Sequence, residues 1–423
     1  MKRTTIFGAV AASLAAMSAQ AEGGFSYWSM WNEGEPQQKV LARAIAVFSE
    51  ETGIEVDVQW VGRDIHKKIG PTLNSPETPF TLVDGERRKI FSSLVTTGSQ
   101  ASLDAVYDME IPGEGVTVDA ALLPNIKNVL VEDDEAWMVP YILLSSGWWY
   151  DAARMPELVG SEPQTWDEMV ALFQSRKDAG HEVIAQDGDI GFYNLWYFTD
   201  IAVRHLGPGK VNAAIEDRSG DALRDPRILR TAEQIEQLVD AGFFAPGYDS
   251  SKWPAQQQLW ASGEVDFMYN GTWLPRETVE FTPEGADPKA FMMPAVSDES
   301  IATNEVGVIG FSISEKGPNI DEAEQFVAWF LKTDYLAELA DEAKVLVPRE
   351  GIEVTEVLQP VYEALNSGAL THNAYDGVNT YNADYTTKIL TPLINELIFG
   401  QIDAQEFQDE LVDQTTLYWE LRD

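Results

Sequence analysis

The sequence predicts an α/β protein of two domains, each assembled from segments that are not continuous in the chain. Strand and helix patterns alternate from residue 25 onward, which is typical of a mostly parallel sheet covered by helices. The 423 residues exceed the usual length of one domain. Two proline-containing extended segments, at 137–141 and 291–296, fit crossings between the domains.

The first strand–helix–strand unit opens the patterned region. Pro36 suits the first turn of a helix, whose apolar residues then recur on one face until Gly53 ends it. The strand after Gly53 alternates apolar and polar residues, and the next strand ends in acidic residues. Ligand crevices in such sheets lie at the carboxyl ends of the strands. The predicted elements are a strand at 25–30, a helix at 36–50, and strands at 54–60 and 81–84.

The alternation continues through the rest of the chain. Thr165 and Glu168 have the spacing of a capping box, and Asn319 and Glu322 offer a similar start to a later helix. Because the chain leaves the first domain, builds the second, returns and leaves again, both domains are discontinuous. We expect an N-terminal lobe of 22–135 plus 296–340 and a C-terminal lobe of 136–295 plus 341–423. The elements that support this are a strand at 147–151, helices at 165–178 and 225–241, a strand at 263–273, and helices from about 353 to the end.

The first 21 residues predict export. Lys2 and Arg3 precede an apolar run at 6–17, and Ala19-Gln-Ala21 is a small-x-small cleavage site. We expect cleavage after Ala21 and a periplasmic protein; a retained signal anchor is the alternative. The chain has no cysteine, which excludes a disulfide and a lipid-modified cysteine at the cleavage point.

The charge excludes several partners. The net charge is −40, and it becomes −42 once the first 21 residues, with two basic and no acidic side chains, are removed. Such a surface repels nucleic acid and anionic lipid head groups. The acids are spread along the chain, which indicates a solvated surface; a saline habitat or calcium binding could account for them, although no DxDxDG-type loop is present. We expect a monomer that needs no cofactor.

The stretch 25–35 is the most informative in the chain because two tryptophans stand at the end of a strand beside acids and an amide. Flat apolar faces next to hydrogen-bond acceptors suit a sugar ring. Trp28, inside the strand, favours the core, and Trp31, at the turn, favours a binding site. The polar residues that we expect to bind ligand are Asn32, Glu33, Arg63, Asp84, Glu86 and Asn270.

Other aromatic residues stand near turns. Trp148 and Trp149 point to opposite faces of a strand, so at most one lines a cleft. Trp253 lies in a loop without apolar periodicity. Tyr193 and Trp196 lie three residues apart after a glycine-rich turn, and one of them facing a cleft is favoured over both. We expect Trp166 and Trp329 to lie in the core. The aromatic ligand-binding candidates are Trp31, Trp148, Tyr193, Trp196, Trp253 and Tyr381.

The order of several motifs resembles one family, the extracellular solute-binding proteins of carbohydrate ABC transporters (family 1), relatives of the maltodextrin-binding proteins. The resemblance covers essentially the whole mature chain. Each motif alone is weak evidence for the family, but so many motifs in the same order as in the family are strong evidence. The motifs are Trp31-Asn-Glu-x-Glu, Phe48-x-x-x-Thr-Gly-Ile-x-Val, Val139-Pro-Tyr, Trp149-Tyr-Asp, Pro163-Gln-Thr-Trp-Asp-Glu, Asp225-Pro, Trp260-Ala-Ser-Gly-Glu-Val-Asp-Phe-Met-Tyr-Asn-Gly-Thr-Trp273, Pro294 and the helix starting Gly400-Gln-Ile-Asp.

This resemblance implies a two-lobed periplasmic-binding-protein fold of type II, whose hinge strands let the lobes close on a sugar. It also implies transient contact with membrane permease subunits of an importer. Trp273 resembles the family's stacking aromatic residue. One departure is Phe80, which stands where relatives usually have an acid before the third strand, and it weakens the assignment of Asp84 and Glu86.

Two other classes of protein compete with a binding protein. A secreted glycoside hydrolase would also be acidic and rich in tryptophan, and would need two carboxylates roughly 5–10 Å apart. No P-loop, GxSxG or HExxH motif is present, and the four histidines are widely scattered. An adhesin would show repeats or low-complexity segments, which the sequence lacks. The sequence therefore favours a sugar-binding protein without catalysis, with an oligosaccharide or glycoside preferred over a single monosaccharide.

Overall fold

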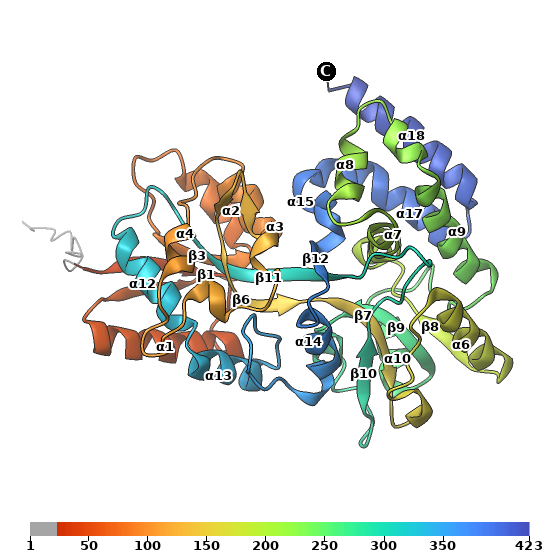
Figure 1. The fold of residues 1–423 in the computed structure, drawn as a ribbon, viewed down its shortest axis with the longest axis horizontal. Helices are drawn as coiled ribbons and strands as arrows, with labels where there is room; N and C mark the ends of the chain where they lie inside the picture. The colour runs from red at the N-terminus through yellow and green to blue at the C-terminus, as the bar shows by residue number, and fades with distance from the viewer. Residues whose placement is uncertain (1–22, 423) are drawn as a thin grey trace, which may run out of the picture.

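The computed structural model describes residues 23–422, which form two lobes with a β-sheet each (Figure 1). We call them the N-lobe and the C-lobe. The N-lobe sheet contains, in spatial order, β12 (Leu370–Asn373), β11 (Thr303–Ile313), β3 (Leu82–Glu86), β1 (Phe25–Ser29) and β2 (Val56–Trp60), with β6 (Val139–Leu144) paired to β11. The C-lobe sheet contains β10 (Pro288–Phe291), β7 (Ser146–Asp151), β9 (Val265–Gly271) and β8 (Glu182–Ala185). A separate hairpin pairs β4 (Val131–Glu132) with β5 (Glu135–Ala136).

Both sheets mix strand directions, although the prediction was a mostly parallel sheet. In the N-lobe, β1 runs parallel to β2 and β3, whereas β11 is antiparallel to β3 and β6. In the C-lobe, β8 is parallel to β9, and β7 is antiparallel to β9 and β10. The predicted α/β class is confirmed, and the antiparallel pairs come from the strands that cross between the lobes.

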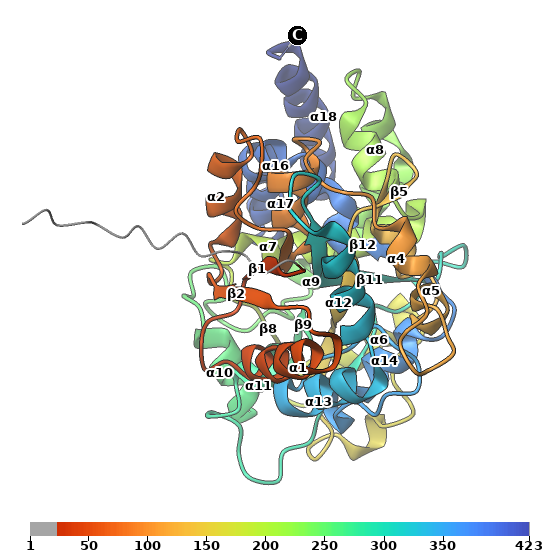
Figure 2. The same ribbon diagram turned by 90° about the vertical axis from the view of Figure 1, so that its left-hand side faces the viewer.

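Helices cover both sheets. In the N-lobe, the long helix α1 lies beside α13 and near α12, as Figure 2 shows at the base of that lobe. The N-lobe helices are α1 (Pro36–Thr52), α2 (Ile65–Ile69), α3 (Arg87–Ile90), α4 (Asp104–Asp108), α5 (Val118–Ala121), α12 (Ile320–Phe330) and α13 (Thr333–Ala343). Those on the C-lobe side are α6 (Trp166–Asp178), α7 (Gly191–Leu206), α8 (Lys210–Glu216), α9 (Pro226–Asp240), α10 (Ala255–Ser262), α11 (Leu274–Glu277), α14 (Gln359–Leu365), α15 (Val378–Tyr381), α16 (Ala383–Tyr385), α17 (Thr391–Ile398) and α18 (Ala404–Glu420).

Two extended stretches connect the lobes. The chain passes from β6 directly into β7 with only Ser145 between them, and β11 runs alongside (Figure 1). The first crossing lies where the sequence predicts one. The second was predicted at 291–296, and that is wrong: β10 ends at Phe291, and Ala295 bridges Thr165 within the C-lobe. The return to the N-lobe is made by β11, which follows this segment in the chain.

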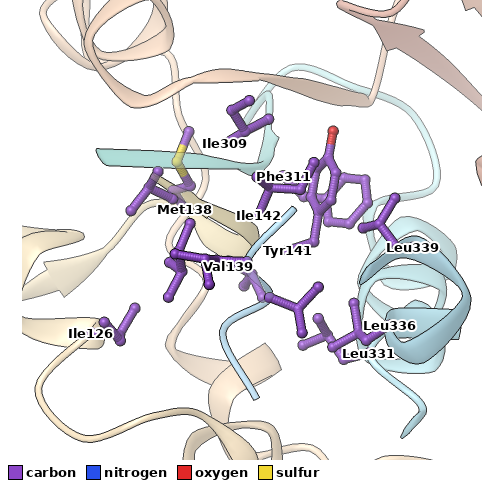
Figure 3. Packing of buried hydrophobic residues seen from close by; sticks show 14 of the residues in the cluster. Ile126, Met138, Val139, Tyr141, Ile142, Ile309, Phe311, Leu331, Leu336 and Leu339 are labelled. Carbon is purple, nitrogen blue, oxygen red and sulfur yellow. The ribbon is translucent and has the colours of Figure 1, made fainter. Parts of the chain in front are cut away.

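The buried apolar residues form two clusters, one centred in the N-lobe that extends into the C-lobe through Trp149 and Met268, and one within the C-lobe. In the N-lobe, the Tyr141 ring stacks on Phe311 with centroids 4.5 Å apart, and Leu336 and Leu339 of α13 lie beside them (Figure 3). Trp166 and Trp329 are buried as predicted. The Trp28 side chain is partly buried against the N-lobe core.

Local signals set most helix ends. The Thr165 hydroxyl accepts from the Glu168 amide and the Glu168 carboxylate accepts from the Thr165 amide, so the predicted capping box is confirmed. The predicted cap at Asn319 is wrong, because that residue adopts a left-handed backbone and its side chain donates to the Gly24 carbonyl instead. Among the described residues, every helix is too short or too polar to cross a bilayer. The predicted signal sequence and its cleavage point lie outside the described residues.

Candidate functional site

The parallel strands β1, β2 and β3 bring their carboxyl ends to one edge of the N-lobe sheet. Trp31 follows β1 and is buried; its indole nitrogen donates to the Tyr141 hydroxyl over 2.7 Å. Arg63, just beyond β2, places its guanidinium 4.4 Å from the Trp31 ring centroid. The predicted platform is therefore covered by a cation, an arrangement that is itself stabilising.

Arg63 is also tied to Glu35, a residue that sequence reasoning left out of the site. Its two terminal nitrogens each lie 2.9 Å from a Glu35 oxygen, and one also donates to the Met30 carbonyl. Burial acts to raise the pKa of Glu35, but the Asn32 amide and Arg63 outweigh it and leave that pKa lowered. Asn32 and Glu33 are exposed on the same turn. Together these groups form a charged rim beside Trp31.

Asp84, at the end of β3, does not face solvent. It is fully buried, and its carboxylate accepts from the Met30 amide (2.6 Å), the Ser29 hydroxyl (3.2 Å) and the Tyr141 hydroxyl. The prediction that Asp84 contacts ligand is not supported by this geometry: it fixes the turn that carries Trp31. Glu86, two residues on, is half-buried and pairs with Arg88 and Lys89.

We expect the unliganded protein to melt at a higher temperature at pH 5 than at pH 7.5. Burial raises the pKa of Asp84 from 3.8 to about 6. The folded state then holds this proton more tightly than the unfolded chain, so the free energy of unfolding falls as pH rises from about 4 to 6. This rise in the pKa of Asp84 means that the free energy of unfolding is lower by roughly 3 kcal/mol at neutral pH than at acidic pH. Calorimetric melts across this pH range measure the change of Tm with pH. This change should be smaller in Asp84→Asn than in the parent; an equal change in both proteins would contradict the role of Asp84.

Four aromatic side chains of the C-lobe pack together, and we call them the aromatic shelf: Tyr193, Trp196, Trp273 and Tyr375. Tyr193 and Trp196 lie one turn apart at the start of α7 and stack nearly parallel, with centroids 5.5 Å apart. On Trp196 also pack Tyr375, at 5.7 Å, and Trp273, at 5.7 Å. Sequence reasoning favoured one of Tyr193 and Trp196; both belong to the shelf. Trp273 is the most exposed of the four.

Trp273 lies flat over the backbone where β9 ends. A Cβ added at Gly271 would lie 2.4 Å from the Trp273 ring, so only glycine lets the ring approach this closely. Asn270 is fully buried, and its side-chain oxygen accepts from the Gly271 amide. Its predicted role as a ligand contact is not supported in this conformation; it shapes the turn beneath Trp273.

Tyr375 was not predicted, because its 3-10 turn, Ala374–Gly377, carries no aromatic periodicity. Its backbone has a φ of 55°, a left-handed conformation that is costly for a tyrosine and is often found at functional sites. The Glu305 carboxylate accepts from its amide. Burial raises the pKa of Tyr375, and the carboxylates of Glu305 and Glu86 add to that rise.

Polar groups border the shelf at the end of β8. The Asp187 carboxylate accepts from the Gln256 amide through one oxygen, and its other oxygen has no partner. Burial raises the pKa of Asp187 to about 6. The Gln257 side chain donates to the Tyr193 hydroxyl over 3.3 Å. Trp253 is 49% exposed, and its amide donates to Asp189.

Two predicted aromatic residues lie elsewhere. Trp148 has 0% exposure and packs on Phe173, Tyr197 and Tyr269 within the C-lobe core, so its assignment to the cleft is wrong. Tyr381 joins the lobes: its hydroxyl accepts from Arg87 (3.0 Å) and donates to Glu132 (3.2 Å). Both facts reflect tertiary contacts that sequence spacing does not encode.

A family model described as bacterial extracellular solute-binding protein matches residues 100–337, more than half of the chain. The chain belongs to this family. The solute-binding family is extracellular or periplasmic, and its members bind solutes without a catalytic role. The resemblance inferred from the motifs is thereby confirmed.

Individual relatives of this solute-binding protein are distant. A diacetylchitobiose binding protein, NgcE, of Streptomyces coelicolor is 23% identical over 235 residues, 55% of this chain and 49% of that protein. An ABC transporter extracellular-binding protein of Pyrococcus horikoshii is 25% identical over 158 residues, 36% of each. The chain thus matches half or less of the length of these curated relatives. The structure of RafE from Streptococcus pneumoniae matches with a TM-score of 0.74 at 18% identity, covering 93% of this chain and 97% of RafE, which supports the two-lobed fold.

Proposed function

We propose that this solute-binding protein captures a carbohydrate between the aromatic shelf and the N-lobe rim, and delivers it to the permease subunits of an ABC importer. The aromatic shelf is the observation that carries the proposal. Trp273, which follows β9 and is the partly exposed ring of the shelf, offers apolar contact to the C–H faces of a sugar, and the buried rings behind it hold it in place.

The polar groups around the shelf supply the complementary chemistry. Glu86 of the N-lobe, which is half-buried, is a hydrogen-bond acceptor for hydroxyl groups. Asp187 of the C-lobe is a second acceptor, but its unpartnered oxygen is buried and would meet a ligand only after its neighbours move. Arg63 and Glu35 form a pair that a ligand could reorganise on binding. The abundance of aromatic residues in the chain favours a ligand of more than one sugar unit.

The hinge explains how both lobes contribute. Because β6–β7 and β11 are the strands that connect the sheets, rotation about them would bring Trp31 and Glu86 toward the shelf. We further propose that the mature protein begins at Glu22 and acts as a periplasmic monomer. A closed form would present a distinct surface to the permease.

Ligand screening tests the proposal. The panel would include diacetylchitobiose, because NgcE is named for binding it, and raffinose, because a solved structure is of RafE in complex with it. We expect at least one sugar to stabilise the protein, by roughly 2.7 kcal/mol at a hundredfold excess over its Kd. The measurement is the shift in Tm, followed by titration calorimetry.

The same samples separate binding from catalysis. After incubation, the sugar should be recovered with unchanged mass and without new reducing ends. Cleavage of the sugar would favour the hydrolase alternative, which also uses acids near aromatic rings. Absence of any shift across mono-, di- and oligosaccharides would contradict the carbohydrate proposal.

A further inference from the structure

A buried group of three ligating side chains lies directly behind the aromatic shelf. Asp200 comes from α7, Glu305 from β11 and His372 from β12, so the group joins the C-lobe to a strand that crosses between the lobes. One ligand atom from each lies within 4.8 Å of the others. The three residues are only 3%, 4% and 4% exposed. Within residues 23–422 no other group of this kind was found.

The neighbours of Asp200 and His372 leave one atom of each free. The Ser146 hydroxyl, at 2.8 Å, and the Tyr269 hydroxyl both donate to Oδ2 of Asp200, whereas its Oδ1 has no partner. The Nδ1 atom of His372 is bonded to the Thr303 hydroxyl at 2.9 Å, and its Nε2 has no partner. These two atoms lie 3.6 Å apart, too far for a good hydrogen bond but close enough for an ion pair when the imidazole is charged. Buried polar atoms without a partner are costly, so a missing ligand is a direct explanation.

Glu305 links this group to the shelf. Its oxygens accept from the Trp196 indole at 2.8 and 2.9 Å, and from the Tyr375 amide at 3.2 Å. Asp200 and Glu305 thus place two carboxyl groups around one small cavity, where a bound cation would offset their mutual repulsion.

We propose that Asp200, Glu305 and His372 bind one divalent transition-metal ion, with Zn²⁺ as the test ion. An imidazole nitrogen with two carboxylate oxygens is a ligand set that suits Zn²⁺. In known metal sites, the ligand side chains are oriented by hydrogen bonds to their atoms that do not bind the metal. The Ser146 hydroxyl bonds to Asp200 and the Thr303 hydroxyl bonds to His372 in this way. They hold the inner atoms toward one another before any ion binds.

The surroundings provide space for an ion. A cavity of about 10 Å³ touches all three side chains, which is close to the volume that one water molecule needs. His372 also lines a larger pocket of about 520 Å³, bordered by Asn125, Asn373 and Tyr381. Arg204 lines the small cavity as well and is the competing source of positive charge. The His372 imidazole, when charged, is a second competitor, because its Nε2 then pairs with Asp200.

Such an ion would fix the shelf from behind. By holding Glu305, it would hold the indole of Trp196 and the backbone of Tyr375, and it would tie α7 to β11 and β12. This consequence rests on the proposed function; the metal site itself does not, because it stands on the free atoms of Asp200 and His372.

Metal titration of the mature protein tests the site. After treatment with a chelator, we expect one equivalent of Zn²⁺ to bind in competition with a chromophoric chelator, in the presence of excess Mg²⁺ to occupy surface acids. Asp200→Asn and His372→Gln should each weaken Zn²⁺ binding at least about tenfold, as should the outer variant Thr303→Val. Co²⁺ should give a visible absorption spectrum that His372→Gln abolishes.

His181→Gln is the matched control. His181 also lies 3.6 Å from a carboxylate, that of Asp266, but near the surface and beside Arg176. This variant should bind Zn²⁺ like the parent. Thr303→Val keeps the test decisive if a ligand variant fails to fold, since it removes one hydroxyl only. Absence of the single equivalent, or its persistence in folded Asp200→Asn and Thr303→Val, overturns the proposal, and neither result bears on the binding of sugar at the shelf.

Discussion

Trp273→Ala is expected to raise the Kd for the carbohydrate about thirtyfold or more while leaving the unliganded Tm almost unchanged. Trp273 stands at the open edge of the aromatic shelf, 5.7 Å from Trp196, and is only partly buried. Truncating an aromatic anchor in a desolvated contact costs roughly 2 kcal/mol or more, and each 1.4 kcal/mol is a tenfold change in Kd. Titration calorimetry and a melt on the same preparation give both quantities.

Two further variants sharpen this experiment. Gly271→Ala places a Cβ where the Trp273 ring lies, so it should displace the ring and weaken binding without removing it. Trp60→Ala removes another partly buried tryptophan, on β2 beside Tyr27, and should leave the affinity unchanged. If Trp273→Ala instead lowers the Tm strongly and keeps its affinity, then Trp273 belongs to the core and the shelf is not the binding surface.

Patterns that act over short stretches predicted the fold well. The strand–helix–strand unit at the start needs only alternation, Pro36 and Gly53, and it appears as β1, α1 and β2. The capping box at Thr165 is equally local, because both of its hydrogen bonds join residues three apart. The crossing by β11 was missed because its 11 residues resemble any buried strand, whereas the proline-containing segment before it only looked like a crossing.

The site depended on contacts that no local pattern records. Asp84 ends a strand as a ligand-binding acid would, yet Tyr141, far along the chain, reaches its carboxylate and encloses it. The tryptophan pair at 148–149 shows the same limit, since alternation predicts that the rings diverge but not that both are fully buried. Asp200, Glu305 and His372 are brought together by three elements distant in sequence. Residues such as these are recognised only once the topology is known.

Trp148→Ala is expected to destabilise the protein by roughly 3–5 kcal/mol, the cost of truncating a fully buried tryptophan. Its ring lies 4.9 Å from that of Tyr269 and 5.1 Å from that of Phe173, so alanine would leave a cavity in the C-lobe core. Urea unfolding of the unliganded protein measures the loss. Because Trp148 has no exposed surface, protein that remains folded should bind the sugar with nearly unchanged affinity.

Trp148→Phe provides the comparison that isolates packing. The indole nitrogen of Trp148 has no hydrogen-bond partner, and a buried donor without one is a cost to the folded state. Phenylalanine keeps much of the apolar contact and removes that donor, so its loss of stability should be clearly smaller than that of alanine. An unchanged urea midpoint in Trp148→Ala together with lost sugar affinity would return Trp148 to the binding site, and the C-lobe core would then have to open on ligand binding.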